Sequence, residues 1–144
     1  MIQSFILSFK GENMDNLEKN INFKHMSSCL RRDDSIIERN MDLEKSFGIK
    51  NISFYYYVEQ GDDVHIVGEV FAKIPLKQSF CFICTLYDDD GDIIESKVND
   101  SYGSGVVTSM IKPDNFFDGF PFSFTFYDPK VTIARIKIVP AISY

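Results

Sequence analysis

Apolar and polar residues alternate along most of the chain after residue 48, and this period of two predicts β-strands. Clusters of Gly, Pro, Asp and Asn bound each alternating stretch, as they do at strand ends. The predicted strands cover residues 49–58, 64–72, 80–87, 93–98, 103–111, 120–126 and 131–139. The connections are too short for the crossover helices that parallel strands need, so we expect mainly antiparallel sheets.

The stretch 120–126 indicates how these sheets pack. Phe occupies every second position from Phe120 to Phe126, so four Phe side chains share one face. Burying one Phe contributes about 1.5–3 kcal/mol, and such a face therefore requires an opposing layer. Residues 49–144 are expected to form a seven-stranded, antiparallel β-sandwich.

Residues 1–48 have a different texture, with more charged residues and less regular apolar spacing. We interpret them as an N-terminal extension of the sandwich. Within the extension, residues 2–9 alternate and favour a strand.

The extension also carries one helix signal, over residues 35–47. Ser35 and Glu38 have the spacing of a capping box, in which each side chain bonds a free backbone N–H. Gly48 stands where a left-handed residue ends many helices. The apolar stripe that would pack on the sheet comprises Ile36, Ile37, Met41, Leu43 and Phe47.

Net charge, apolar run lengths and cysteine count indicate which partners and which compartment to expect. The chain has 15 Lys and Arg against 21 Asp and Glu, a formal charge of −6, which disfavours nucleic acids and anionic membranes. No apolar run reaches the length of a membrane span, and the first ten residues lack the pattern of a signal peptide. Three Cys do not suggest a disulfide framework. We therefore expect a cytoplasmic protein with reduced thiols.

Cys81 and Cys84 have the spacing of half a zinc site. A second pair is missing from the sequence, and only Cys29, His25 and His65 remain as scattered ligands. In a strand, positions three apart point to opposite faces. We interpret both residues as ordinary core or surface thiols and expect no cofactor.

The acidic segment 88–92 follows the predicted strand 80–87. It contains the dipeptide Asp-Gly, which is a strong hairpin signal. Turn formation accounts for its residues. A second interpretation stays open, in which Asp88, Asp90 and Asp92 bind a cation weakly, together with Asp62 or Asp63, because Ca²⁺ prefers several carboxylate oxygens.

Two segments carry a family pattern: Val-His-Ile-Val-Gly-Glu-Val at residues 64–70 and Cys-Thr-Leu-Tyr-Asp-Asp-Asp-Gly-Asp-Ile-Ile at residues 84–94. Over about residues 50–140, the chain resembles the FxLYD-type domains of bacterial proteins. The resemblance implies an immunoglobulin-like sandwich without catalytic residues. Cys84 stands where the first Phe of the motif belongs, and members of that family usually look exported or membrane-tethered.

Aromatic residues are the strongest candidates for function. Tyr55 and Tyr57 lie opposite Phe54 in the strand alternation, on the outer face, and Tyr is enriched at protein interfaces. Phe116 and Phe117 fall in a predicted loop, where they either form a recognition surface or plug the end of the sandwich. We hypothesise a non-catalytic module that binds a protein partner or self-associates. The alternative is a carbohydrate- or calcium-binding domain.

Overall fold

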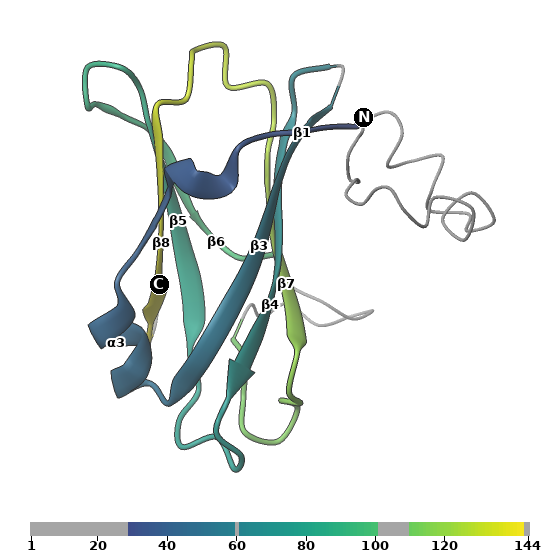
Figure 1. Cartoon of the computed structure of the whole chain (residues 1–144), viewed down its shortest axis with the longest axis vertical. Helices are drawn as coiled ribbons and strands as arrows, with labels where there is room; N and C mark the ends of the chain where they lie inside the picture. The colour runs from purple at the N-terminus through teal and green to yellow at the C-terminus, as the bar shows by residue number, and fades with distance from the viewer. Residues whose placement is uncertain (1–28, 60, 101–109, 143–144) are drawn as a thin grey trace, which may run out of the picture.

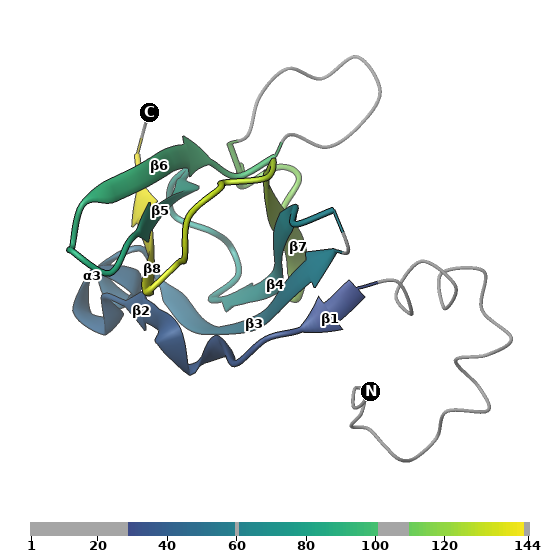
Figure 2. The ribbon, with the colours of Figure 1, turned by 90° about the horizontal axis from the view of Figure 1, so that it is seen from above.

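Two four-stranded β-sheets pack face to face, as Figures 1 and 2 show from two directions. The computed structural model describes residues 29–59, 61–100 and 110–142. Sheet A has the strand order β1-β3-β4-β7, and sheet B has the order β2-β8-β5-β6. The strands are β1 Cys29–Arg31, β2 Ile37–Arg39, β3 Ile49–Glu59, β4 Val64–Ala72, β5 Cys81–Tyr87, β6 Ile93–Val98, β7 Phe120–Phe126 and β8 Arg135–Ala141.

The chain passes between the two sheets in the manner of an immunoglobulin fold. β3 and β4 pair in sheet A, and β5 and β6 pair in sheet B. The chain then places β7 beside β4 and β8 beside β5. Immunoglobulin strands B and E, and C and F, have this same interlocked pairing. The predicted sandwich, mostly antiparallel, is confirmed.

The core lies between the sheets and is dominated by Phe. Phe122, Phe124 and Phe126 of β7 are fully buried, and Phe120 packs against the core from its edge. From the opposing sheet, the Phe82 ring lies 4.5 Å from that of Phe122, measured between centroids. The alternation in β7 therefore places its aromatic face inward, as the sequence predicts.

The segment before Ile49 forms part of the sandwich, so a domain boundary at that residue is placed too late. β1 pairs antiparallel with β3, and β2 pairs in parallel with β8. A short 3-10 helix, η1 (Asp34–Ile36), carries the chain from sheet A to sheet B. The extension thus supplies one edge strand to each sheet.

The predicted helix over residues 35–47 is wrong in its first half, because the α-helix α3 occupies only Met41–Ser46. Ser35 and Glu38 do not form a capping box. The Ser35 amide donates to Asp33 Oδ1 at 3.0 Å, and Glu38 lies in β2. The helix is capped by Asn40, whose Oδ1 accepts from the Leu43 amide at 3.0 Å.

The end of this helix is as predicted. Gly48 follows α3 with φ = 83°, a left-handed conformation that glycine adopts at low cost. α3 contacts both β3 and β8, and so covers one open side of the sandwich. There the Glu44 carboxylate is buried and receives two bonds from Arg39, at 3.0 and 2.6 Å. A buried carboxylate needs such a partner.

The opposite open side is closed by polar bonds to the edge of β7. Lys97 Nζ donates to the Thr125 carbonyl at 2.5 Å, and the Asp100 amide donates to the Ser123 carbonyl at 2.8 Å. Pro121 in the same edge strand has no N–H to offer. These features satisfy or remove the groups with which another strand would pair.

Six of the seven predicted strands are strands in the structure, the last of them shifted to begin at Arg135. The predicted strand 103–111 lies outside the described residues except at its end, where Ile111 bridges Phe80. The predicted strand 2–9 also lies outside the described residues.

Candidate functional site: the outer tyrosine face

The outer face of sheet A carries a compact aromatic and aliphatic patch, which we call the tyrosine face. It consists of Tyr55 and Tyr57 on β3 and Val67 on β4. Tyr55 is directly opposite Val67 in the strand register. Tyr55 is 39% exposed and Val67 40% exposed, so both present apolar surface to solvent. The two tyrosine rings stack, with centroids 6.4 Å apart and planes at 25°.

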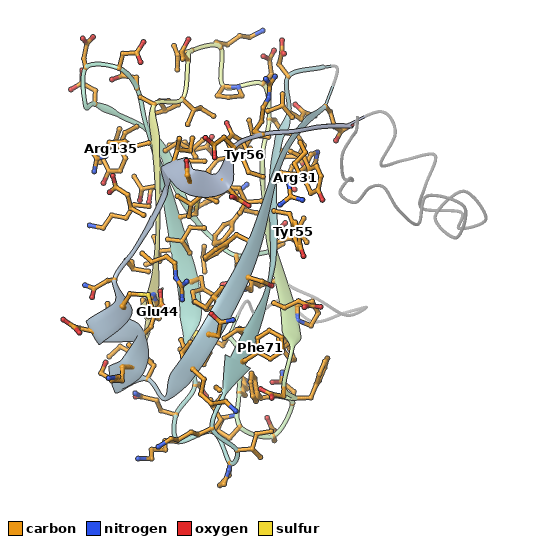
Figure 3. All side chains as sticks on the ribbon, in the orientation of Figure 1. Arg31, Glu44, Tyr55, Tyr56, Phe71 and Arg135 are labelled. Carbon is orange, nitrogen blue, oxygen red and sulfur yellow. The ribbon has the colours of Figure 1, made fainter. Side chains whose placement is uncertain are left out.

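An arginine holds the tyrosine face from one side. β1 pairs Arg31 with Tyr57, and the Arg31 guanidinium carbon lies 4.8 Å from the centre of the Tyr55 ring. Figure 3 shows Arg31 and Tyr55 side by side on this face. Arg31 also forms an exposed ion pair with Asp34 at 3.3 Å. A cation over an aromatic face contributes about 0.5–1 kcal/mol at an exposed site.

A polar chain of three side chains borders the tyrosine face. His65 contacts the carboxylate of Glu59 through Nε2, and its Nδ1 lies 3.3 Å from Thr125 Oγ1. Hydroxyl, imidazole and carboxylate in this order are the groups of a nucleophilic triad. Here they extend across three strands of a sheet surface. β4 pairs with β3 on one edge and with β7 on the other, so its backbone N–H groups are used in the sheet. They are therefore not free to stabilise an oxyanion. The network ties β3, β4 and β7 together.

The outer face of sheet B differs in chemistry. Arg135 donates two bonds to Glu38, at 2.7 and 3.0 Å, and its guanidinium carbon lies 4.4 Å from the Tyr87 ring centre. The bond from Arg135 holds the pKa of Glu38 below its usual value. Lys137 is opposite Glu38 in the strand register. This face therefore presents charged and hydroxyl groups where sheet A presents stacked rings.

The two Phe candidates separate. Phe116 packs against the core and stacks on Phe120, with ring centroids 5.9 Å apart. Phe117 is 55% exposed, and its ring centroid lies 4.9 Å from that of Phe120. Phe116 thus closes the sandwich at the end where β7 begins, whereas Phe117 leaves half of its side chain in solvent.

The acidic hairpin turn brings its three candidate ligands together. Single carboxylate oxygens of Asp88, Asp90 and Asp92 lie within 4.8 Å of one another. Asp88 Oδ1 also accepts from the amides of Asp90 and Asp92, both at 2.9 Å. One carboxylate oxygen is therefore used to hold the turn, as the hairpin interpretation requires.

Both thiols of the Cys81–Cys84 pair are buried and free. Cys84 points into the core, and Cys81 Sγ lies 3.6 Å from the Ala141 carbonyl oxygen. Burial raises the pKa of the Cys81 thiol, and raises that of the Cys84 thiol far above its ordinary value. Since the thiolate is the reactive form, neither residue has the character of a nucleophile or ligand.

The sequence interpretation missed a hollow of about 1030 Å³ at the end of the sandwich where β3, β5 and β7 finish. Its floor is apolar, with Val58 and Val64 among its residues, and its rim is charged. The turns that form the rim are far apart in sequence. Asp33, Asp62, Asp88 and Asp128 each lie in or beside one of them.

The position of this hollow follows from the topology, together with the Asp residues of the turns. In an antiparallel sandwich, every second connection falls at the same end, so the turns after β3, β5 and β7 meet. The turn after β3 contains Asp62 and Asp63, the turn after β5 contains four Asp, and the turn after β7 contains Asp128. Asp62 and Asp128 also have positive φ values of 67° and 39°, a conformation that Asp tolerates better than most residues.

Comparisons with known proteins add no relative. No family model matches the chain, and neither a curated protein nor a solved structure gives a significant match. The fold and the surface chemistry are therefore the basis for any proposal about function. Among the described residues, no helix is long and apolar enough to cross a membrane.

Proposed function

We propose that this chain is a non-catalytic interaction module that binds a protein partner through the tyrosine face. The observation that carries the proposal is the exposed Tyr55 ring, which stacks on Tyr57, lies beneath Arg31 and is opposite exposed Val67. Tyrosine and arginine dominate the residues that contribute most to protein binding. The resemblance to FxLYD-type domains, with their non-catalytic role, agrees with this function and stays a prediction.

Preorganisation supports the tyrosine face as a binding surface. Ring stacking and the arginine fix the tyrosine side chains before a partner arrives, so little side-chain entropy is lost on binding. The contrast with sheet B also supports it. There, Arg135 is occupied by Glu38 in a two-bond pair, and the surrounding face is polar. A partner that buries apolar surface therefore gains more binding free energy on the outer face of sheet A than on that of sheet B.

A photo-crosslinking experiment in cells tests this proposal. Benzoylphenylalanine replaces Val67 on the tyrosine face in one variant and Thr85 on the outer face of sheet B in the matched control. We expect a discrete crosslinked product from position 67 that is absent at position 85. Equal labelling from both positions, or no product from position 67, contradicts the proposal.

Calcium binding is a second candidate, favoured by the convergence of Asp88, Asp90 and Asp92. An ion that binds the folded state raises the melting temperature by mass action. We expect millimolar Ca²⁺ to raise the melting temperature of the natural protein and not that of an Asp90→Ser, Asp92→Ser variant. An equal response of the two proteins removes this candidate. A carbohydrate ligand is tested in the same way, with a glycan panel.

We further propose that the protein works in the cytoplasm. The support is the pair of buried, free thiols at Cys81 and Cys84, which a reducing compartment preserves. Fluorescence microscopy of the tagged full chain in its own cells tests this. Export of the tagged protein contradicts it.

A further inference from the structure

The two ends of the sandwich carry opposite charge. The acidic hollow of about 1030 Å³ lies where β3 ends and β4 begins. A second hollow, of about 410 Å³, lies at the other end, between α3, the start of β3 and the β4–β5 loop. The β3–β4 register fixes the two positions, because Ile49 pairs with Ala72 at one end and Val58 with Val64 at the other.

The second hollow, which we call the lysine end, has only positive side chains among the charged, described residues that line it. Lys45, Lys50, Lys73 and Lys77 line it, and no carboxylate of the described residues does. Lys50 is paired with Asp118, which lies outside the lining, at 4.0 Å. All four lysines are exposed. The loop between Lys73 and Lys77 also presents Ile74, which is 66% exposed. The loop tip therefore offers an aliphatic side chain flanked by two positive charges.

The acidic hollow has the complementary composition. Among the described residues, six carboxylates and two cationic side chains line it, which gives these groups a net charge of −4. One of the six, Asp128, is neutralised locally by an ion pair with Lys130. Exposed Asp89 and Asp90 have no ion pair with a described residue. Below this rim the floor is apolar, so the hollow suits a ligand that combines positive charge with an aliphatic group.

A buried hydroxyl points independently to a ligand in this hollow. Tyr56 lines the hollow and is only 6% exposed, and its hydroxyl has no hydrogen-bond partner among the described residues. Figure 3 shows Tyr56 between the two sheets beside η1. A buried hydroxyl without a partner is unfavourable, so a ligand group that accepts a hydrogen bond from it gains from binding there. Burial raises the pKa of this phenol, which keeps it a donor.

We propose that copies of this chain associate head to tail, with the Lys73–Lys77 loop of one copy in the acidic hollow of the next. Lys73 and Lys77 meet the carboxylate rim, and Ile74 meets the apolar floor. A carbonyl of the incoming loop accepts from the Tyr56 hydroxyl. The occupant is a second copy because this chain itself presents the required chemistry, at the end opposite the hollow.

This arrangement predicts an open assembly. The two contacting surfaces differ, so each copy keeps one unused end, and further copies add unless the rotation closes a ring. Since the attraction is between exposed charges, it weakens as salt shortens the screening length to roughly 3 Å at 1 M. The tyrosine face is not involved, so either proposal can fail without the other.

Sedimentation velocity of the purified full chain tests the proposal. We expect the weight-average mass to rise with concentration above that of the 16.6-kDa monomer at low salt, and to return to it at 1 M NaCl. Lys73→Gln, Lys77→Gln should weaken association at least tenfold, and Asp89→Ser, Asp90→Ser should do the same. The matched control, Lys137→Gln on the outer face of sheet B, should associate as the natural protein does.

Mixing the two defective variants is the decisive arm. Each retains one intact surface, so an equimolar mixture should form complexes of two chains and no larger ones. Tyr56→Phe, which removes only the hydroxyl, should weaken association with folding intact by circular dichroism. A natural protein that stays monomeric at low salt and millimolar concentration overturns the proposal. Equal loss in the Lys137→Gln control, or no complex in the mixture, also overturns it.

Discussion

Sheet A carries aromatic residues on both faces, and the two faces differ in what the rings contact. On the inner face, Phe122 and Phe124 are fully buried against the opposing sheet. On the outer face, Tyr55 and Tyr57 stack on each other, Arg31 lies over the Tyr55 ring, and Tyr55 is exposed to solvent. The strands that carry them are paired neighbours of β4. Sheet A therefore uses inward-facing aromatic residues to fill the core and outward-facing ones to form a surface. Alternation along each strand decides which face a residue occupies.

This difference teaches that burial decides what an aromatic residue contributes. A ring that fills the core contributes its full transfer free energy to folding. A ring on an exposed sheet face contributes a cross-strand or same-face pair of about 0.2–1 kcal/mol. The outer rings are thus worth little to stability, and their apolar area stays available to a partner.

Removing an inner ring should have the largest effect on stability. Phe122→Ala leaves a cavity beside Phe82, Phe124 and Phe54, and should lower the free energy of unfolding by about 3–5 kcal/mol. Urea denaturation measures this loss. The control is Phe117→Ala, at a half-exposed ring, with an expected loss below about 1 kcal/mol. Equal losses in the two variants contradict the inner-face assignment.

Adding one methyl group to the inner face should have the next largest effect. A Cβ at Gly68 would lie 2.5 Å from the Ser53 carbonyl oxygen and 2.6 Å from Phe122 Cζ, so Gly68→Ala overpacks the core. The expected loss is about 1–3 kcal/mol, measured by chemical denaturation. Gly61→Ala is the matched control, because no atom lies within 4 Å of its added Cβ. If Gly68→Ala left the free energy of unfolding unchanged, the packing around Gly68 would be looser than the structure shows.

Removing the outer rings should cost little stability. Tyr55→Ala, Tyr57→Ala deletes the stacked pair and the arginine contact, and should lower the free energy of unfolding by about 1 kcal/mol. Thermal and urea denaturation measure the change. A loss as large as that of Phe122→Ala would assign the tyrosine face a structural role.

The pH dependence of stability should separate Tyr56 from its outer neighbours, with the smallest effect. Burial raises the pKa of the Tyr56 phenol above its ordinary value near 10. Its contribution is therefore complete below pH 10 and is lost as the pH rises through the higher folded-state pKa. We expect the natural protein to lose slightly more stability than Tyr56→Phe between pH 9 and pH 11. Parallel profiles from urea denaturation would contradict this assignment.

The strands and their two faces were predictable because alternation with a period of two is a local property. The outward position of Tyr55 and the inward face of β7 follow directly from it. β2 was missed because its three residues pair with Ile136–Ile138, about 100 positions later, and this pairing outweighs the helical spacing of Ile36 and Ile37.

The charged ends were not predicted, although their residues are plain in the sequence. The acidic hollow joins η1 with the turns after β3, β5 and β7, and the lysine end joins α3 with the β4–β5 loop. Such convergence is a property of the topology. The unpartnered hydroxyl of Tyr56 depends further on side-chain packing, which alternation does not describe.

The most direct test of the central claim is the dissociation constant of the partner captured at position 67, measured for natural protein and for Tyr55→Ala, Tyr57→Ala. If the tyrosine face is the binding surface, the constant should rise at least tenfold while the variant stays folded, since central aromatic residues dominate binding. An unchanged dissociation constant with a folded variant would contradict the claim.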